Sequence, residues 1–336
     1  MYDFKRIDPT DDDWKAIETT YDGTVYKTKA WFDYLAYQKC KPFIVEIRED
    51  GRKVGYFVGE LLRRGVKLLG APLEGVGTGN QGLAMLKQTA ANERIAIYKD
   101  LAEWVFRKRF AVWMQVEDWQ LLMDDLEGSG LDYEGRDASW IDLTADEETM
   151  FARMDKKSCR YKVNKAIKEG VVIREADDVD KFLDIHYDQC KSVMQGKGLE
   201  PLRSKSHLQN LIKILYPNYL ILLEAVAPTG EVIATGIYAT SDKSACSFSS
   251  GSYRAFSQFC PNELIRWEAF KRCKARGATF FNNNGCMDFK LKFGALRDYR
   301  PRIFFSKHKW LFPLRKFFKN LWQKLRFTLY KIIRRQ

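Results

Sequence analysis

The chain has 336 residues, 46% of them hydrophobic and 14% aromatic, with only nine prolines, which excludes a disordered or low-complexity protein. Its length exceeds what one hydrophobic core usually supports and predicts two domains. The formal net charge is +12, but ten Lys and Arg and no Asp or Glu lie between positions 307 and 335, which leaves only +2 for the rest of the chain.

Residues 1–141 form the first predicted domain. Apolar residues at helical spacing, Trp31, Tyr34 and Leu35, predict a helix over 28–38. Alternating strands on either side of the Asp50-Gly51 turn are typical of a β-hairpin. The elements expected after the hairpin are a glycine-rich loop at 70–82, a helix over about 83–109 and a strand at 111–118.

Residues 142–306 form the second predicted domain, in which strands and helices alternate. The elements expected in it are, in chain order, a helix over 145–154 with Thr144 and Glu147 as its capping box, a basic helix over 157–169, a strand at 171–176, helices over 177–195 and 207–216, a three-stranded meander over 220–253, a helix over 261–277 and a strand at 278–284. This order predicts an α+β fold with mixed, mainly antiparallel sheets flanked by helices. No G-x-G-x-x-G motif follows a first strand, so dinucleotide binding has no support.

Residues 307–336 are predicted to form a basic amphipathic helix. Apolar residues such as Leu314, Phe317 and Leu321 recur at steps of three and four, and Pro313 suits a first helical turn. Such a helix lies at a membrane surface instead of crossing it, and each cation near an anionic leaflet contributes about 1 kcal/mol at most. Two alternatives are that the apolar stripe packs on the protein itself and that the tail binds RNA.

Several classes of protein are excluded by motifs that the sequence lacks. The seven cysteines are scattered singly, without a C-x-x-C pair, so neither a zinc site nor a disulfide framework is expected. The N-terminal residues have no apolar signal-peptide core, and no apolar run is long enough to span a membrane. With three histidines and no G-x-S-x-G or H-E-x-x-H motif, a serine hydrolase or zinc peptidase is not supported.

Three stretches resemble the FemAB-like, GNAT-like acyltransferases, which include the Fem peptidoglycan aminoacyltransferases. They are the basic helix KKSCRYKVNKAIKEGV (156–171), the meander over 230–251, and the helix from Pro261 that leads to FKLKFG (289–294), similar to the family's F-K-x-x-F-G signature. The likeness covers about 28–306. It implies two GNAT-like lobes, the first degenerate and on the acceptor side, the second catalytic.

The resemblance places the FKLKFG signature near the site of acyl transfer. Lys290 is expected to donate to a phosphate or to the developing oxyanion, and Asp288 to accept a proton, because two residues apart in a strand point the same way. The alternatives are a surface lysine and an ordinary salt bridge.

Other candidates are residues that can approach a phosphate or a polar ligand. A basic helix concentrates positive charge, while turn residues and glycines let the backbone come close to a ligand. The residues expected to bind the donor are Arg160, Lys162, Lys165, Ser250 and Gly251, and those expected to bind the substrate are Asn282, Asn284, Gly77 and Gly79. Each also has an ordinary structural interpretation as a solvated helix face, a turn or a hairpin end.

The function that the resemblance implies is transfer of an acyl or aminoacyl group to an amine or hydroxyl of a peptidoglycan or glycan precursor. The donor would be a co-substrate, aminoacyl-tRNA or acyl-CoA, with no tightly bound cofactor and no metal. The expected partners are a cell-envelope precursor, lipid-linked or free, the anionic inner membrane surface through the tail, and tRNA, but not DNA. The rival functions are a CoA-dependent N- or O-acetyltransferase of a glycan or small amine, and an inactive binding module recruited to the membrane.

Overall fold

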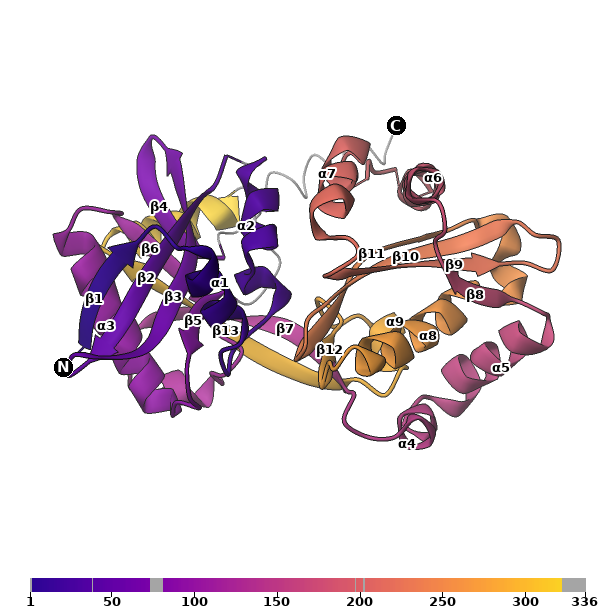
Figure 1. Cartoon of the computed structure of the whole chain (residues 1–336), viewed down its shortest axis with the longest axis horizontal. Coiled ribbons are helices and arrows are strands. Elements are labelled where there is room, and N and C mark those ends of the chain that lie inside the picture. Colours follow the sequence, from indigo (N-terminus) through magenta and orange to yellow (C-terminus); the bar gives the residue numbers. More distant parts are fainter. Residues whose placement is uncertain (1, 38, 73–80, 197, 202, 322–336) are drawn as a thin grey trace.

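The structure is a computed structural model that describes residues 2–37, 39–72, 81–196, 198–201 and 203–321. Two lobes lie side by side, and a long pair of strands runs from one into the other (Figure 1). The elements of the first lobe are β1 (Tyr2–Ile7), α1 (Asp11–Glu18), η1 (Val25–Lys27), α2 (Lys29–Ala36), β2 (Lys41–Glu49), β3 (Arg52–Arg64), β4 (Val66–Ala71), β5 (Gly82–Met85), α3 (Ala91–Arg107), β6 (Trp113–Glu117) and η2 (Asp124–Leu126).

The second lobe contains its predicted elements in the predicted order with shifted ends, but its strands at 132–142 and 296–306 and its short helix at 288–291 were not predicted. Its elements are β7 (Asp132–Asp142), α4 (Glu147–Ala152), the π-helical turn η3 (Lys156–Arg160), α5 (Tyr161–Lys168), β8 (Val172–Glu175), α6 (Val179–Gln195), α7 (Lys205–Leu215), β9 (Leu220–Val226), β10 (Val232–Thr240), β11 (Ser244–Ser252), η4 (Arg254–Phe259), α8 (Pro261–Ala275), β12 (Phe280–Asn282), α9 (Asp288–Leu291) and β13 (Leu296–Ser306). A further helix covers 311–321, which confirms the predicted C-terminal helix over that range. The rest of the predicted tail, 322–336, lies outside the described residues.

One mixed sheet runs through both lobes. Within the described residues its strand order is β1-β2-β3-β4-β6-β13-β7-β12-β11-β10-β9-β8, with β5 on β3. The pairs β4–β6 and β11–β12 are parallel, while the other pairs of this order are antiparallel. A mixed, mainly antiparallel sheet flanked by helices confirms the predicted fold class.

The strands β7 and β13 connect the lobes. They pair along 132–140 and 296–304, after which the end of β7 pairs with β12 and the end of β13 pairs with β6. Both strands therefore belong partly to each lobe, and the boundaries at 141/142 and 306/307 stay predictions.

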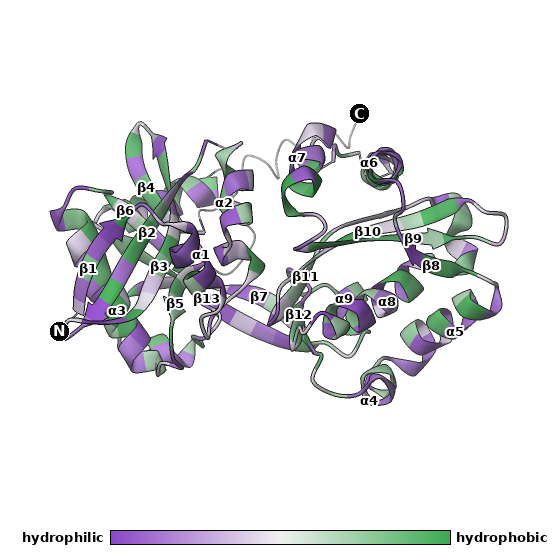
Figure 2. Cartoon of the chain, in the orientation of Figure 1, coloured by the Kyte–Doolittle hydropathy of each residue, from purple (hydrophilic) through white to green (hydrophobic). Residues whose placement is uncertain are grey.

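The meander of the second lobe is buried on both faces. Alternate residues of β9 and β10 enter two different cores: Leu222 and Ile237 pack on the side of α6 and α7, Leu223 and Tyr238 on the side of α5 and α8. Burial on both faces explains why these strands are apolar along most of their length (Figure 2).

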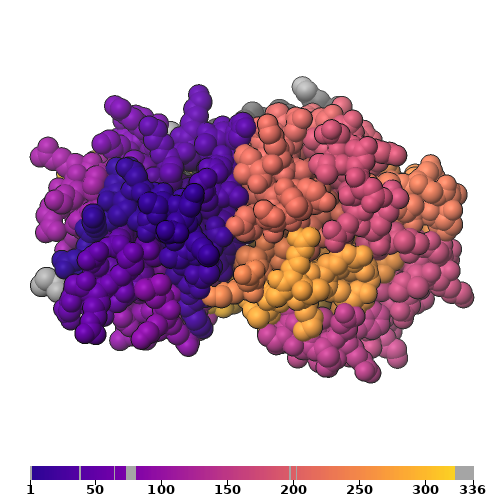
Figure 3. Space-filling model, in the orientation of Figure 1, coloured from indigo at the N-terminus to yellow at the C-terminus, as the bar shows by residue number. Residues whose placement is uncertain are grey.

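The core under α6 and α7 continues into the first lobe. It also contains buried residues of α1, α2 and β3, and the rings of Trp31 and Phe248 approach to 6.2 Å between centroids. Tyr26 Oη and Cys246 Sγ lie 2.9 Å apart across the same boundary. Figure 3 shows the surfaces of the two lobes in contact. This hydrophobic cluster therefore spans both lobes, while each lobe also has a cluster of its own. Because of the shared cluster, the lobes are expected to unfold together.

Two local predictions are wrong. The predicted helix over 83–109 is strand β5 followed by helix α3, which begins only at Ala91. The helix predicted from 145 begins at Glu147, and its N-cap is Asp146, whose carboxylate accepts a hydrogen bond from Thr149 N. Thr144 instead donates to Asp142 Oδ1 at 2.5 Å, so the predicted capping box is absent.

Candidate active site

The candidate site lies where β11 and β12 part. Their parallel pairing ends at Cys246 and Asn282, and Asn284 Nδ2 then donates to Ser247 O at 2.9 Å across the gap. Asn284 has φ +54° and Gly285 has φ +111°, values that asparagine and glycine tolerate better than other residues. The chain can thus turn sharply away from the sheet and leave polar groups at the opening.

Arg266 of α8 is a buried cation at this opening, with only 5% of its surface exposed. Its guanidinium donates to Asn283 Oδ1 at 2.8 Å and to Ser247 Oγ at 3.3 Å. Within the part of the chain that the structure describes, no carboxylate pairs with it, and burial lowers its pKa. A buried charge without a counter-charge is costly, so Arg266 can be stabilised by an anion from outside the chain.

Lys290 of α9 adds a second cation beside Arg266. Its Nζ donates to Asn284 O at 2.8 Å, which holds the half-buried ammonium over the turn. Burial, with a further contribution from the charge of Arg266, lowers the pKa of Lys290 to about 8. The structure therefore brings Lys290 and Asn284 together with Arg266, and the group is electropositive.

The prediction that Asp288 and Lys290 point the same way in a strand is wrong. The segment is the short helix α9 and not a strand, so side chains two residues apart do not point the same way. Asp288 is exposed in the first turn of α9. Its expected role as a proton acceptor stays a prediction.

A single carboxylate, that of Glu263, pairs with a lysine of the basic helix α5 and with a lysine of the FKLKFG segment. Glu263, buried near the start of α8, lies 3.2 Å from Lys162 Nζ and 2.5 Å from Lys292 Nζ. Lys165 of α5 is half-buried. Burial raises the pKa of the nearby Cys260 thiol, and the positive charge of Lys165 offsets part of that rise. Arg160 lies in the preceding π-helical turn, and its buried Nε has no hydrogen-bond partner among the described residues. Lys162 is thus linked to the FKLKFG segment.

The remaining candidate residues have other surroundings. Gly251 is buried under α6, where an added Cβ would lie 2.8 Å from Gln189 Cβ, so close helix packing accounts for the glycine. Ser250 is exposed beside it, and Ser250 O accepts from Cys190 Sγ at 3.7 Å. Asn282 is buried and its Oδ1 accepts from Asn284 N at 2.7 Å. Gly77 and Gly79 lie outside the described residues.

The sequence did not predict three residues of this site, Arg266, Ser247 and Ser139. Ser139 of β7 donates to Gly285 O at 2.8 Å and accepts from Asn283 Nδ2 at 3.2 Å, which fixes the turn from the opposite side. The one available signal was Arg266 itself, a charged residue between Ile265 and Trp267 in an apolar part of α8. The serines carry no distinctive pattern.

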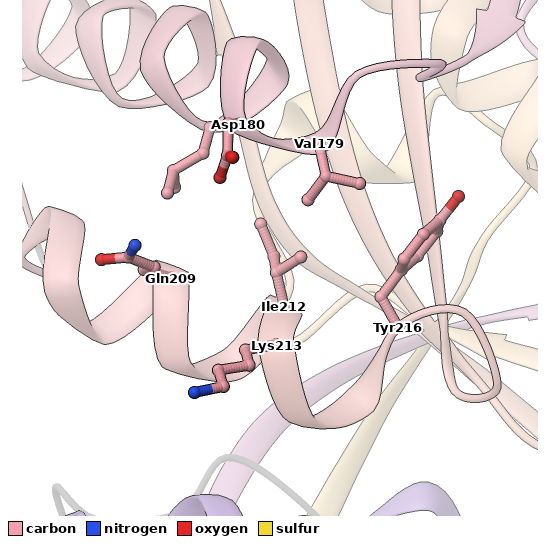
Figure 4. Close-up of a pocket in the computed structure, with 7 residues that line it drawn as sticks. Val179, Asp180, Gln209, Ile212, Lys213 and Tyr216 are labelled. Carbon is pink, nitrogen blue, oxygen red and sulfur yellow. The ribbon is translucent and has the colours of Figure 1, made fainter.

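A separate cavity of about 350 Å³ lies between α6 and α7. Figure 4 shows Val179 and Ile212 facing each other across it. The lining residues are Val179, Asp180, Leu183, Gln209, Ile212, Lys213 and Tyr216. None of the candidate site residues lines this cavity, so it is distinct from the site at β11 and β12.

A second polar cluster surrounds the fully buried His186 of α6. Thr235 Oγ1 donates to Gln189 Oε1 at 2.6 Å, so the His186 Nδ1–H, 2.8 Å away, donates to Thr235. The other ring nitrogen, Nε2, then accepts from Ser249 Oγ at 2.8 Å. Burial lowers the pKa of His186 to about 4, so the neutral ring is the form that the fold holds.

Acidification is expected to destabilise the protein through His186. Its pKa is about 4 when folded and 6.5 ordinarily, so the unfolded chain binds the extra proton between these values. The stabilisation is complete above pH 6.5 and up to about 3 kcal/mol of it is lost as the pH falls toward 4. Urea unfolding across this range should show a shallower loss in His186→Gln. Equal slopes in the two proteins would contradict a buried neutral imidazole.

Comparison with known proteins identifies the second lobe. Residues 153–290 match the model of the acetyltransferase (GNAT) domain family. The match supports a second lobe of the GNAT acyltransferase type. Separately, no helix in the described part of the chain is long and apolar enough to cross a membrane.

Most of the chain is similar to several solved structures. FemX aligns with a TM-score of 0.72 and 11% identity over 89% of this chain and 96% of its own. A conserved protein of unknown function from Bacteroides thetaiotaomicron VPI-5482 aligns with a TM-score of 0.58 and 13% identity, over 91% of this chain and 100% of its own. L-PGS from Bacillus licheniformis aligns with a TM-score of 0.52 and 12% identity, over 90% of this chain and 93% of its own. No curated protein matches the chain in sequence. The predicted FemAB-like, GNAT-like resemblance is confirmed at the level of the fold.

Proposed function

We propose that the chain transfers an acyl or aminoacyl group from a phosphate-bearing carrier to an amine or hydroxyl of a cell-envelope precursor. One observation carries the proposal: Arg266 and Lys290 lie together at the parting of β11 and β12, and no described carboxylate pairs with either. Acyl transfer places negative charge on the carbonyl oxygen, and fixed cations and donors in a partly buried site stabilise that charge.

In this proposal each part of the electropositive group has its own task. Lys290, cationic at neutral pH, donates to the developing oxyanion, while Arg266 orients Asn283 and contributes positive charge. Lys162 and Lys292, which Glu263 holds together, are suited to the carrier's phosphates, with Arg160 and Lys165 on the same helical segment. The carrier's ester or thioester bond breaks, the new amide or ester bond forms, and the acceptor's proton passes to the leaving group.

The proposed aminoacyltransferase and the rival acetyltransferase differ in their donor, which is aminoacyl-tRNA in the first and acyl-CoA in the second. The C-terminal domain of a putative lysylphosphatidylglycerol synthetase from Agrobacterium fabrum aligns with this chain, with a TM-score of 0.52 and 10% identity over 86% of this chain and 92% of its own. Its name includes an amino acid and a phospholipid. That name favours an aminoacyl donor, and an acceptor at the inner face of the membrane is what the FemAB-like resemblance implies. The GNAT domain equally supports acyl-CoA.

Purified protein should therefore deacylate one carrier in an acceptor-dependent manner. We expect faster loss of the aminoacyl group from a mixed aminoacyl-tRNA pool when a lipid-linked peptidoglycan precursor is added, with a product heavier by one aminoacyl residue in mass spectrometry. Thiol release from acetyl-CoA under the same conditions would instead favour the acetyltransferase. If neither carrier is consumed and envelope precursors are unchanged in cells lacking the protein, the transferase proposal fails, which leaves the inactive binding module.

A further inference from the structure

The helix over 311–321 contacts the rest of the protein through a side that carries one aromatic ring, Phe312, and two cations, Arg315 and Lys319. Phe312 stacks near Trp113, with ring centroids 6.4 Å apart, and packs on Phe304 at 5.2 Å. Arg315 and Lys319 both pair with Glu134 of β7, at 3.1 and 2.8 Å. Positions 312, 315 and 319 lie on one side of a helix, so this side is the bound one.

The opposite side of the same helix is apolar and faces solvent. Positions 314, 317, 318 and 321 fall on it, and Trp310 in the turn before the helix extends it. The exposed fractions are Trp310 60%, Leu314 41%, Phe317 62%, Phe318 57% and Leu321 42%. We call these five residues the tail face. The helix is thus inverted relative to an ordinary surface helix, which turns its apolar side inward.

Glu134 fixes the helix in this inverted position. Burial raises the pKa of Glu134, but the hydrogen bond from Lys319 and the charge of Arg315 outweigh that effect, so its pKa lies below the usual range. The carboxylate therefore stays ionised at neutral pH and keeps both cations on the bound side. Scattered exposed apolar side chains need no explanation, whereas a continuous apolar face held outward by ion pairs does.

The charges around the tail face favour one kind of partner. Residues 307–321 contain five Lys and Arg, residues 322–335 contain five more, and neither segment contains an acidic residue. Lys307 and Lys309 are exposed before the helix begins, and Lys316 is exposed on the helix between its bound side and the tail face. A second copy of this chain would bring like charges together, and RNA would leave the aliphatic Leu314 and Leu321 without an apolar partner. An anionic lipid surface matches both the cations and the apolar side chains.

We propose that the tail face docks on the surface of an anionic lipid bilayer. Phe317, Phe318 and Trp310 would enter the boundary between headgroups and acyl chains, while the lysines remain at the level of the headgroups. The docking needs no acyl donor and goes beyond the transferase proposal. It would hold the first lobe against the membrane.

Vesicle sedimentation of the full chain tests this proposal directly. We expect binding to vesicles that contain phosphatidylglycerol, about tenfold or more weaker binding to phosphatidylcholine alone, and weaker binding at high salt. The double variant Phe317→Ser with Phe318→Ser should bind anionic vesicles at least about tenfold more weakly. Val172→Ser, which changes another apolar side chain that is 61% exposed, is the matched control and should bind like the wild type.

Three results would overturn the proposal. The first is unchanged vesicle binding in the double variant. The second is binding to tRNA that the same two substitutions abolish while vesicle binding is absent. The third is a concentration-dependent dimer that dissociates in the double variant, which would assign the tail face to a second copy. Because the assay contains no donor, it can succeed or fail independently of the transferase assay, and circular dichroism confirms that the variants are folded.

Discussion

Lys290→Ala is expected to lower the rate of acyl transfer at saturating donor by about 100-fold or more, with a smaller effect on donor binding. The reason is that Lys290 Nζ, held by Asn284 O, is the cation proposed to meet the oxyanion, which is fully charged only in the transition state. Transfer kinetics with the carrier identified by the deacylation assay give the two parameters separately. Lys191→Ala, which changes an exposed lysine of α6, is the matched control.

The pH dependence separates two roles for Lys290. Its pKa is about 8, so the cation prevails below pH 8 and the neutral amine above it. An oxyanion donor must be cationic, and the rate should therefore fall as the pH rises through about 8. Lys290→Arg, which stays charged, should lose this decline. A wild-type rate that instead rises through pH 8 would make Lys290 the proton acceptor and would contradict the assignment.

The second lobe was largely predictable because its signals are local. The meander alternates around a Pro-Thr-Gly turn, and Pro261 at the first helical position announces α8. The first lobe was predicted less completely. Strand β1 and helix α1 were missed, although Thr10 and Asp13 form a capping box that the sequence already contains.

The errors have a common physical cause, which is that tertiary packing overrides a local pattern. The alternation in FKLKF is typical of a strand, yet Phe293 is buried in the core beside α8 and Lys292 O accepts from Asp155 N at 2.8 Å, contacts that accompany the short helix α9. The pairing of β13 with β6 likewise depends on residues almost two hundred positions apart. No sequence period reports such a contact.

The candidate site illustrates the same limit. The asparagines after β12 are recognisable as turn formers, and Lys290 was found through its signature. Arg266 was not predicted, because its role follows from its burial without a paired carboxylate among the described residues, and only the folded structure shows this. The amphipathic tail was also predictable, whereas its inverted orientation depends on Glu134, far away in the sequence.

The first lobe depends on another buried cation, Arg94 of α3, which does have carboxylate partners. Its guanidinium lies 3.0 Å from Asp22 Oδ2 and 2.7 Å from Asp118 Oδ2, and all three side chains are at most 1% exposed. Tyr98 Oη also donates to Asp118, at 2.7 Å. Arg94→Ala is expected to lower the free energy of unfolding by about 3–5 kcal/mol, because two buried carboxylates lose the guanidinium that pairs with both, and only the charge of the buried Lys27 remains near them. Urea unfolding at neutral pH measures the loss.

Acidification should reduce the difference in the free energy of unfolding between Arg94→Ala and the wild type. Burial raises the pKa of Asp118, but the charges of Arg94 and Lys27 and the hydrogen bonds from Gln120 N and Tyr98 together outweigh it and hold that pKa below its usual value, so the wild type retains this stabilisation above pH 3.8. Removal of Arg94 is expected to raise the pKa of Asp118, so the cost of the unpaired carboxylate falls as the pH drops. Arg107→Ala, at an exposed position of the same helix, should change stability by less than about 0.5 kcal/mol. A loss that is the same at pH 7 and at mildly acidic pH would trace the effect to packing of the arginine stem instead of to charge.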